Sequence, residues 1–126
     1  DATKFGVSFP ADALLIPIPL DPIREQRRGF NQAELIAKQL GARWELEVAS
    51  GALAHQKKKT AQALLDARGR WNEIYGTFAV REPARIQGST VCVIDDVKTT
   101  GATIEEASRV LKAAGAKRIL AISVAH

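Results

Sequence analysis

The architecture of this chain follows from one stretch, Val91-Cys92-Val93-Ile94-Asp95-Asp96-Val97-Lys98-Thr99-Thr100-Gly101-Ala102-Thr103. The residues from Thr90 to Ile94 are apolar and β-branched, which is typical of a buried strand. A helix is expected from Ile104 to Ala114, because apolar side chains recur there at three- and four-residue steps. Gly115 follows, where a helix commonly ends on a glycine cap. The stretch therefore predicts a strand, a turn and a helix in direct succession.

The rest of the chain repeats this alternation. The apolar run from Ala13 to Ile18 is stopped by proline, so we interpret it as a buried strand that leaves the sheet at Pro17. A helix is expected from Phe30 to Leu40, with Gly41 as its stop. Shorter strands are expected at Leu46–Ala49 and Thr77–Val80, and a last buried strand at Ile119–Val124. Alternating strands and helices predict an α/β fold with a parallel sheet, whose ligands lie beyond the carboxyl ends of the strands.

The totals of the sequence limit the class of protein. A length of 126 residues fits one domain, residues 1–126. The single cysteine, Cys92, excludes an internal disulfide and a cysteine-based metal cluster. No apolar run reaches the roughly 20 residues of a membrane span, and no secretory signal is evident, so we expect a cytoplasmic protein without membrane insertion. Because the chain opens with Asp1 and contains no methionine, we expect a fragment or a trimmed form.

The net charge of +4 favours a partner that carries phosphate, either a small molecule or a polymer. Much of the basic charge lies between Ser50 and Gly76, the stretch with the least periodicity. Its weak periodicity and many charges predict a flexible basic loop.

The quoted stretch carries the chemistry. Asp95 and Asp96 are adjacent carboxylates, which repel each other, and carboxylates are good acceptors for the vicinal hydroxyls of a sugar. The following turn is small and rich in hydroxyls, and its backbone N–H groups, with the helix N-terminus behind them, favour an anion. Gly101 lets the backbone approach a phosphate closely. The alternative is an ordinary strand-to-helix turn with Thr103 as the N-cap; the order of the parts favours a sugar-phosphate site.

This stretch resembles the loop with which type I phosphoribosyltransferases bind 5-phosphoribosyl 1-pyrophosphate (PRPP). The resemblance implies a type I phosphoribosyltransferase-like parallel sheet flanked by helices. It places the basic stretch from Ser50 to Gly76 where these transferases carry a flexible loop that closes over the site and excludes water; the alternative is a disordered basic loop without that role. The resemblance also implies that Asp95 and Asp96 contact the ribose, and that Mg²⁺ binds with PRPP, mainly through sugar hydroxyls and pyrophosphate, without dedicated protein ligands. The implied 5-phosphate site consists of Lys98, Thr99, Thr100, Gly101, Ala102 and Thr103. The stretch is not a P-loop, since the Gly-Lys-Ser/Thr ending is missing.

A second stretch narrows the resemblance. Pro17-Ile18-Pro19-Leu20, Arg24 and Arg28-Gly29-Phe30-Asn31-Gln32-Ala33-Glu34-Leu35 are similar to the ComF group, a competence-associated branch of these proteins. The candidate pyrophosphate-binding residues are Pro19, Leu20, Arg24 and Arg28, because Arg suits bidentate phosphate contacts. A solvated loop is the alternative for the two arginines. We expect Asn31 to cap the next helix. The Cys-rich zinc module that members often carry at the N-terminus is not in this sequence.

Three functions remain open from the sequence. As an enzyme, a glycosyltransferase, the protein would transfer the phosphoribosyl group of PRPP to a nitrogen acceptor; no catalytic residue or general base is identified. As a binding module, it would hold PRPP or a nucleoside monophosphate without turnover. As a competence or DNA-uptake factor, it would bind single-stranded DNA or proteins of the competence machinery. The oligomeric state is open, with a dimer as one alternative.

Overall fold

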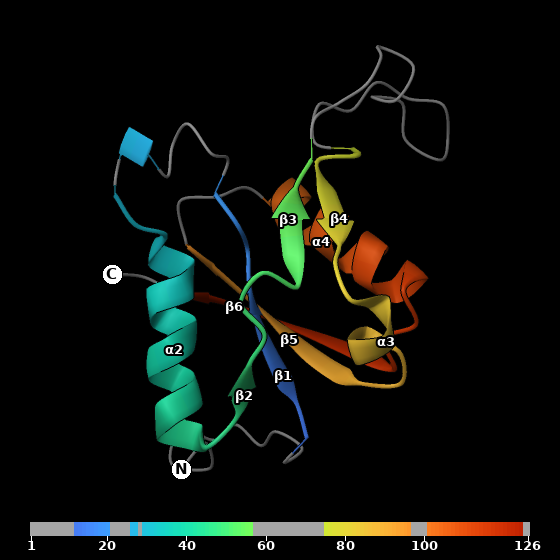
Figure 1. Cartoon of the computed structure of the whole chain (residues 1–126), viewed down its shortest axis with the longest axis horizontal. Coiled ribbons are helices and arrows are strands. Elements are labelled where there is room, and N and C mark those ends of the chain that lie inside the picture. Colours follow the sequence, from blue (N-terminus) through green and yellow to red (C-terminus); the bar gives the residue numbers. More distant parts are fainter. Residues whose placement is uncertain (1–11, 21–25, 28, 57–74, 97–100, 125–126) are drawn as a thin grey trace.

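A computed structural model describes residues 12–20, 26–27, 29–56, 75–96 and 101–124. Four parallel strands form its main sheet in the order β2-β1-β5-β6. They are β1 (Leu14–Pro17), β2 (Glu47–Val48), β5 (Thr90–Asp96) and β6 (Arg118–Val124). Because all pairings are parallel, the carboxyl ends of the strands meet at one edge of the sheet (Figure 1). The expected α/β fold is confirmed.

The two faces of the main sheet are covered differently (Figure 1). Helix α2 (Gln32–Trp44) packs on one face. Helix α4 (Gly101–Ala113) packs on the other face, beside a second sheet of two antiparallel strands, β3 (Leu53–His55) and β4 (Phe78–Val80). The short helix α3 (Pro83–Ile86) lies between β4 and β5 in the chain. Each of α2 and α4 has 13 residues, and no helix in the described ranges is long and apolar enough to cross a membrane.

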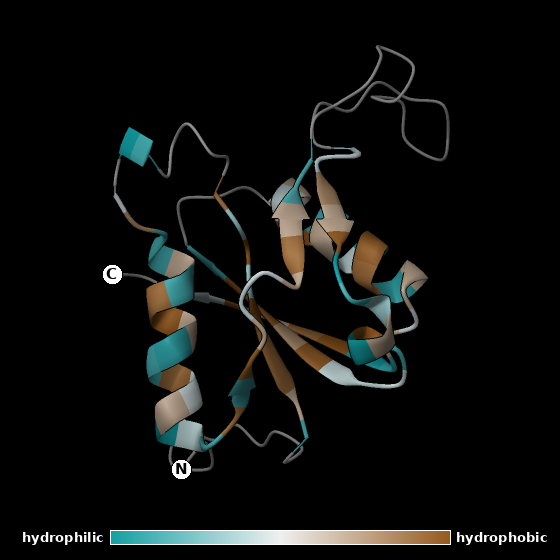
Figure 2. Cartoon of the chain, in the orientation of Figure 1, coloured by the Kyte–Doolittle hydropathy of each residue, from teal (hydrophilic) through white to brown (hydrophobic). Residues whose placement is uncertain are grey.

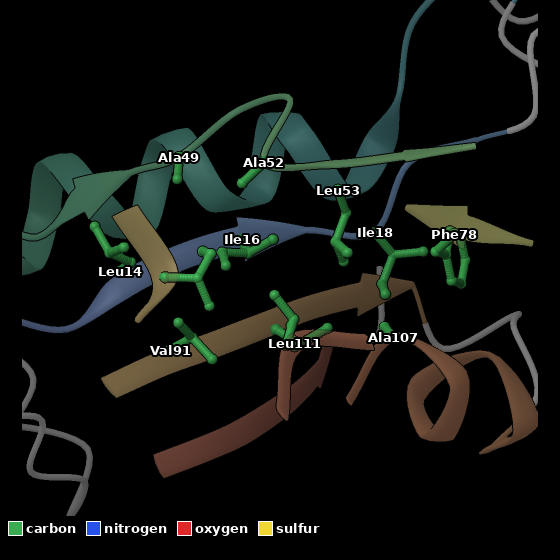
Figure 3. Packing of buried hydrophobic residues seen from close by; sticks show 12 residues of the cluster. Leu14, Ile16, Ile18, Ala49, Ala52, Leu53, Phe78, Val91, Ala107 and Leu111 are labelled. Carbon is green, nitrogen blue, oxygen red and sulfur yellow. The ribbon is translucent and has the colours of Figure 1, made fainter. Parts of the chain in front are cut away.

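Successive side chains of the central strands point to opposite faces of the sheet, which divides the core into two clusters. Leu14 and Ile16 of β1 join the cluster that includes α4 and the β3–β4 pair, shown in Figure 3. Leu15, between them, joins the cluster under α2. Strand β5 alternates in the same way, and the two strands are apolar along most of their length (Figure 2). Strands that are buried on both faces need such continuous apolar runs, which explains why they were recognisable from the sequence.

Helix α2 does not stop at Gly41 but continues to Trp44 and ends at Glu45, which adopts the left-handed conformation. The expectation for Gly41 was therefore wrong. Gly41 is buried, and a Cβ built on it would lie 2.5 Å from Val48 Cγ2 and 2.9 Å from the Leu46 carbonyl oxygen. The glycine allows the helix to approach the following strand closely. At Gly115, by contrast, the expected cap is confirmed, because Gly115 follows α4 with a φ of 98°.

The last strand is less buried than expected. Strand β6 forms the edge of the sheet, and its residues are half-buried or exposed, with Ala121 and Ser123 among the exposed ones. An edge strand has a neighbour on one side only, and the layers above and below are centred on β1 and β5. The sequence of β6 resembled that of a central strand, because neither kind of strand shows a regular alternation of apolar and polar residues here.

The middle of the chain also differs from expectation. The stretch from Ser50 to Gly76 contains strand β3, which was not expected, while residues 57–74 lie outside the described part of the chain. Helix α3 was not expected either. Strand β3 has three residues and pairs with β4 more than twenty positions later, with Leu53 opposite Val80. So short a strand has no periodicity that a sequence can reveal.

We predict that Gly41→Ala destabilises the protein. Alanine gains about 1 kcal/mol of helix propensity over glycine, but overpacking costs about 1–3 kcal/mol, and one of the two close atoms belongs to the rigid backbone. Thermal and urea unfolding measure the change. The matched control is Gly101→Ala in the first turn of α4, where no described atom lies within 4 Å of the added Cβ. A rise in melting temperature for Gly41→Ala would contradict the close-approach explanation.

Candidate functional site

The carboxyl edge of the main sheet brings together the ends of β1 and β5 and the start of α4. Strand β5 extends to Asp96, two residues beyond the expected end, so both acidic residues lie within the paired strand. Asp95 is opposite Ser123 of β6, and Asp96 is opposite Val124. The site is therefore attached directly to the most extensively paired strand of the fold.

Both carboxylates are buried. Asp95 is 1% exposed and Asp96 is 7% exposed. The backbone N–H of Asp96 donates a hydrogen bond of 2.8 Å to Oδ1 of Asp95. Alternation along the strand places Asp95 on the face of Val93 and Asp96 on the face of Ile94. The pair lies at the carboxyl end of a central strand, the edge at which parallel sheets of this kind bind their ligands, so it is a candidate functional site on structural grounds as well.

The predicted phosphate loop is described only in part. Gly101 and Ala102 are exposed and Thr103 is half-buried; all three lie in the first turn of α4. Lys98, Thr99 and Thr100 lie outside the described residues. Because α4 already includes Gly101, Thr103 lies inside the helix and is not its N-cap, so that part of the alternative is wrong. The first N–H groups of a helix have no partner within the helix, and in the sequence four residues separate Asp96 from the first described residue of α4.

The chain that leaves β1 contains the predicted pyrophosphate residues. Pro19 and Leu20 are half-buried beside the end of β1, whereas Arg24 and Arg28 lie outside the described ranges. Ile18 donates its N–H to the carbonyl oxygen of Ile94 at 2.9 Å. This bond continues the β1–β5 pairing past Pro17. The segment that leaves β1, residues 18–20, which we call the exit of β1, therefore runs alongside the strand end that carries Asp95.

Asn31 is the helix cap that the sequence predicted. Its Oδ1 accepts the N–H of Ala33 at 3.0 Å, and it is the N-cap of α2. Its Nδ2 also donates to the carbonyl oxygen of Ile18 at 3.0 Å. One buried side chain therefore stabilises the start of α2 and fixes the exit of β1 at the same time.

Sequence reasoning missed a third buried carboxylate, Glu106 on α4. It accepts two hydrogen bonds of 2.8 Å from Arg109 and a third of 2.8 Å from the backbone N–H of Gly76. The guanidinium of Arg109 lies 4.2 Å from the ring centre of Tyr75. The hydrogen bond to Glu106 raises the pKa of Arg109. This cluster attaches the start of the β4 segment to the helix that begins at the site.

One signal in the sequence pointed to this cluster. Glu106 and Arg109 are three residues apart, a spacing that brings side chains together on a helix. The sequence does not show that the glutamate faces inward, because its other partner, Gly76, is thirty residues away. Cys92, by contrast, is the packing residue that was expected: it is fully buried, and burial raises the pKa of its thiol to about 12.

We predict that Glu106→Ala lowers the free energy of unfolding by about 2–3 kcal/mol. It removes the acceptor of three hydrogen bonds and leaves the half-buried Gly76 N–H without that partner. Hydrogen bonds to charged groups contribute about 1.5–3 kcal/mol each, but Arg109 is partly exposed and regains water. The control is Glu105→Ala, an exposed neighbour on the same helix, which should change stability by less than about 0.5 kcal/mol. Equal effects of the two substitutions in urea unfolding would contradict the assignment.

Comparison with known proteins agrees with this geometry. The family described as phosphoribosyl transferase domain matches residues 26–126. The chain is 32% identical over 105 residues to the DNA utilization protein YhgH of Escherichia coli, covering 83% of this chain and 45% of that protein. It is 31% identical over 106 residues to competence protein F of Haemophilus influenzae, covering 83% and 46%.

A relative from a third organism gives the same result. The chain is 36% identical over 100 residues to competence protein ComFC of Bacillus subtilis, covering 78% of this chain and 38% of that protein. The chain thus spans about half the length, or less, of the curated relatives it matches. The family match covers both the strand–turn–helix at Asp95 and the Asn31 cap. The chain therefore belongs to the phosphoribosyl transferase domain family, in its ComF-like branch.

Proposed function

We propose that this chain binds PRPP, or the ribose 5-phosphate part of a nucleotide, at the carboxyl edge of its main sheet. The observation that carries the proposal is the buried Asp95–Asp96 pair, which lies at the end of a central strand and is separated from α4 by four residues. A carboxylate beside a helix N-terminus gives acceptors for hydroxyls next to donors for a phosphate. A sugar phosphate presents these two kinds of group within a few ångströms.

The parts of the ligand are assigned to different elements. Asp95 and Asp96 accept the ribose hydroxyls, while the residues from Lys98 to Thr103 surround the 5-phosphate. Pro19 and Leu20 at the exit of β1, with Arg24 and Arg28, hold the pyrophosphate. The arrangement in the described region supports this assignment, because the exit of β1 is hydrogen-bonded to the end of β5.

Magnesium fits the donor set as a companion of the ligand. No three His, Cys, Asp or Glu side chains gather as a metal site in the described ranges. A cation bound here would take most of its ligands from the sugar hydroxyls and the pyrophosphate, with Asp95 and Asp96 nearby. When bound, Mg²⁺ neutralises charge on the pyrophosphate.

Transfer is the reaction that such a site would perform as an enzyme. A nitrogen acceptor forms a bond to C1 of the ribose, the bond from C1 to the pyrophosphate oxygen breaks, and pyrophosphate leaves with the electron pair. The nitrogen loses its proton to water or to a base. The protein contributes by positioning the groups and stabilising the charge that develops.

A DNA-related role is the second candidate. Relatives are named DNA utilization protein and competence protein, and this chain has a net charge of +4. Phe30 is 45% exposed just before the cap of α2, and an exposed aromatic ring near basic residues is a feature of surfaces on which bases stack. If this role holds, affinity for single-stranded DNA falls steeply with salt. Binding of PRPP with no such DNA binding would favour the first candidate alone.

We predict that the double variant Asp95→Asn, Asp96→Asn binds PRPP with Mg²⁺ much more weakly. An amide is a poorer acceptor than a carboxylate, and a hydrogen bond to a charged group contributes about 1.5–3 kcal/mol, so affinity should fall about tenfold or more per site. The melting temperature should hold or rise slightly, because an Asn Oδ1 still accepts the N–H of residue 96. Isothermal titration calorimetry and thermal unfolding give the two readings. Binding equal to that of the parent would show that the ribose assignment is wrong.

We predict that Gly101→Ala weakens PRPP binding without destabilising the fold. The space around an added Cβ contains no described atom within 4 Å, so the methyl group has room in the free protein. A phosphate at the start of α4 would occupy that space. PRPP and ribose 5-phosphate should therefore bind more weakly, while inorganic pyrophosphate with Mg²⁺ should bind as in the parent. Unchanged affinity for ribose 5-phosphate would remove Gly101 from the phosphate site.

A further inference from the structure

We propose that His55, on the second sheet, is a positioning residue for the pyrophosphate end of the site. This proposal rests on the proposed function. His55 is not one of the residues that the sequence assigned to the site, and it belongs to a strand that the sequence did not predict. It reaches the site by holding the backbone of Pro19.

The contact between the two residues is a single hydrogen bond. Nε2 of His55 lies 3.0 Å from the carbonyl oxygen of Pro19, and the bond is partly buried. A carbonyl oxygen only accepts, so Nε2 carries the hydrogen and donates it. Proline has no backbone N–H. The carbonyl is therefore the backbone group through which the protein can hold Pro19 in place.

The imidazole is held in position from the other side. Strand β3 pairs with β4 so that His55 lies opposite Phe78, and the two rings meet edge to face with centroids 5.1 Å apart. The Phe78 ring also belongs, with Ile18 and Leu53, to one buried cluster, and Figure 3 shows these three side chains together at the end of β1. The apolar contact thus brings β3 to the exit of β1, and the hydrogen bond sets the direction of the exit.

The exit of β1 is fixed from three separate elements. Strand β5 accepts the N–H of Ile18, Asn31 at the start of α2 donates to the carbonyl of Ile18, and His55 donates to the carbonyl of Pro19. The first two contacts come from the main sheet and its helix. The third comes from the second sheet and lies one residue nearer to the segment that follows Leu20.

Preorganisation is the consequence of these contacts for binding. A backbone segment that is already held in its bound direction loses less conformational freedom when an anion binds to it. Without His55 the two contacts at Ile18 remain, but the peptide after Pro19 loses its attachment to β3. We therefore expect loss of affinity for the pyrophosphate group and no loss for the ribose phosphate group, which binds at β5 and α4.

The experiment separates the two halves of the ligand. Inorganic pyrophosphate with Mg²⁺ and ribose 5-phosphate with Mg²⁺ are titrated calorimetrically into the parent, His55→Leu and His55→Gln. Removing one neutral hydrogen bond should weaken pyrophosphate binding by His55→Leu about three- to tenfold, with ribose 5-phosphate affinity within about twofold. His55→Gln supplies an amide donor and should recover much of the lost affinity. The double Asn variant of Asp95 and Asp96 should show the opposite selectivity.

Each outcome decides the proposal. Parental pyrophosphate affinity in His55→Leu overturns it, and so does equal weakening of both ligands, which indicates a purely structural role. If the parent binds ribose 5-phosphate and His55→Leu binds pyrophosphate normally, the proposed function stands and the role of His55 is wrong. If the parent binds neither ligand, the proposed function fails and this inference fails with it.

A measurement on the folded parent covers the case in which His55→Leu does not fold. In a His126→Gln background, His55 is the single histidine of the sequence. Its imidazole ¹⁵N shifts should report hydrogen on Nε2 and should move when pyrophosphate with Mg²⁺ is added. Ribose 5-phosphate alone should move them much less. Imidazole shifts that do not change when pyrophosphate is added, or that change equally with both ligands, would contradict the proposal.

Discussion

The pairing of β1 with β5 at the centre of the main sheet is the constraint on which the rest of the structure depends. The two strands are buried on both faces, and four successive residue pairs join them, from Leu14 with Val91 to Pro17 with Ile94. Both core clusters contain side chains from these strands, so every packed layer rests on them. A parallel pair of this kind also requires its two carboxyl ends to leave the sheet side by side.

That geometry explains why the candidate site lies where it does. The chain leaving β1 and the chain leaving β5 emerge next to each other, and the bond from Ile18 to Ile94 extends the pairing one step beyond the strand. Asp95 and Asp96 then follow on the more firmly paired strand, while Pro19 and Leu20 follow on the other. Two segments more than seventy residues apart in sequence thereby form one edge, which is where we propose that the sugar phosphate binds.

Polar side chains join the elements around the carboxyl edge of the main sheet by hydrogen bonds. Apolar packing alone only brings these elements close to one another. Asn31 links the start of α2 to β1, His55 links β3 to the exit of β1, and Glu106 links α4 to the segment entering β4. In each case the side chain bonds to a backbone group, which would otherwise need another partner in a partly buried region. The second sheet and α4 are in this way held against the site by hydrogen bonds as well as by the shared core.

The residue pattern alone was enough for the central strands, for α4 and for the position of Asp95 and Asp96 between them, because each depends on local features: continuous apolar runs, helical spacing and a strand–turn–helix order. The residue pattern gave a wrong or incomplete prediction where a feature depends on a contact between residues that are distant in the sequence. Gly41 looked like a helix stop, but it is small because Val48 packs against it. Strand β6 looked central, but its place at the edge depends on the sheet order. The roles of His55 and Glu106 exist only through partners that are 36 and 30 positions away, which folding alone brings within hydrogen-bond distance.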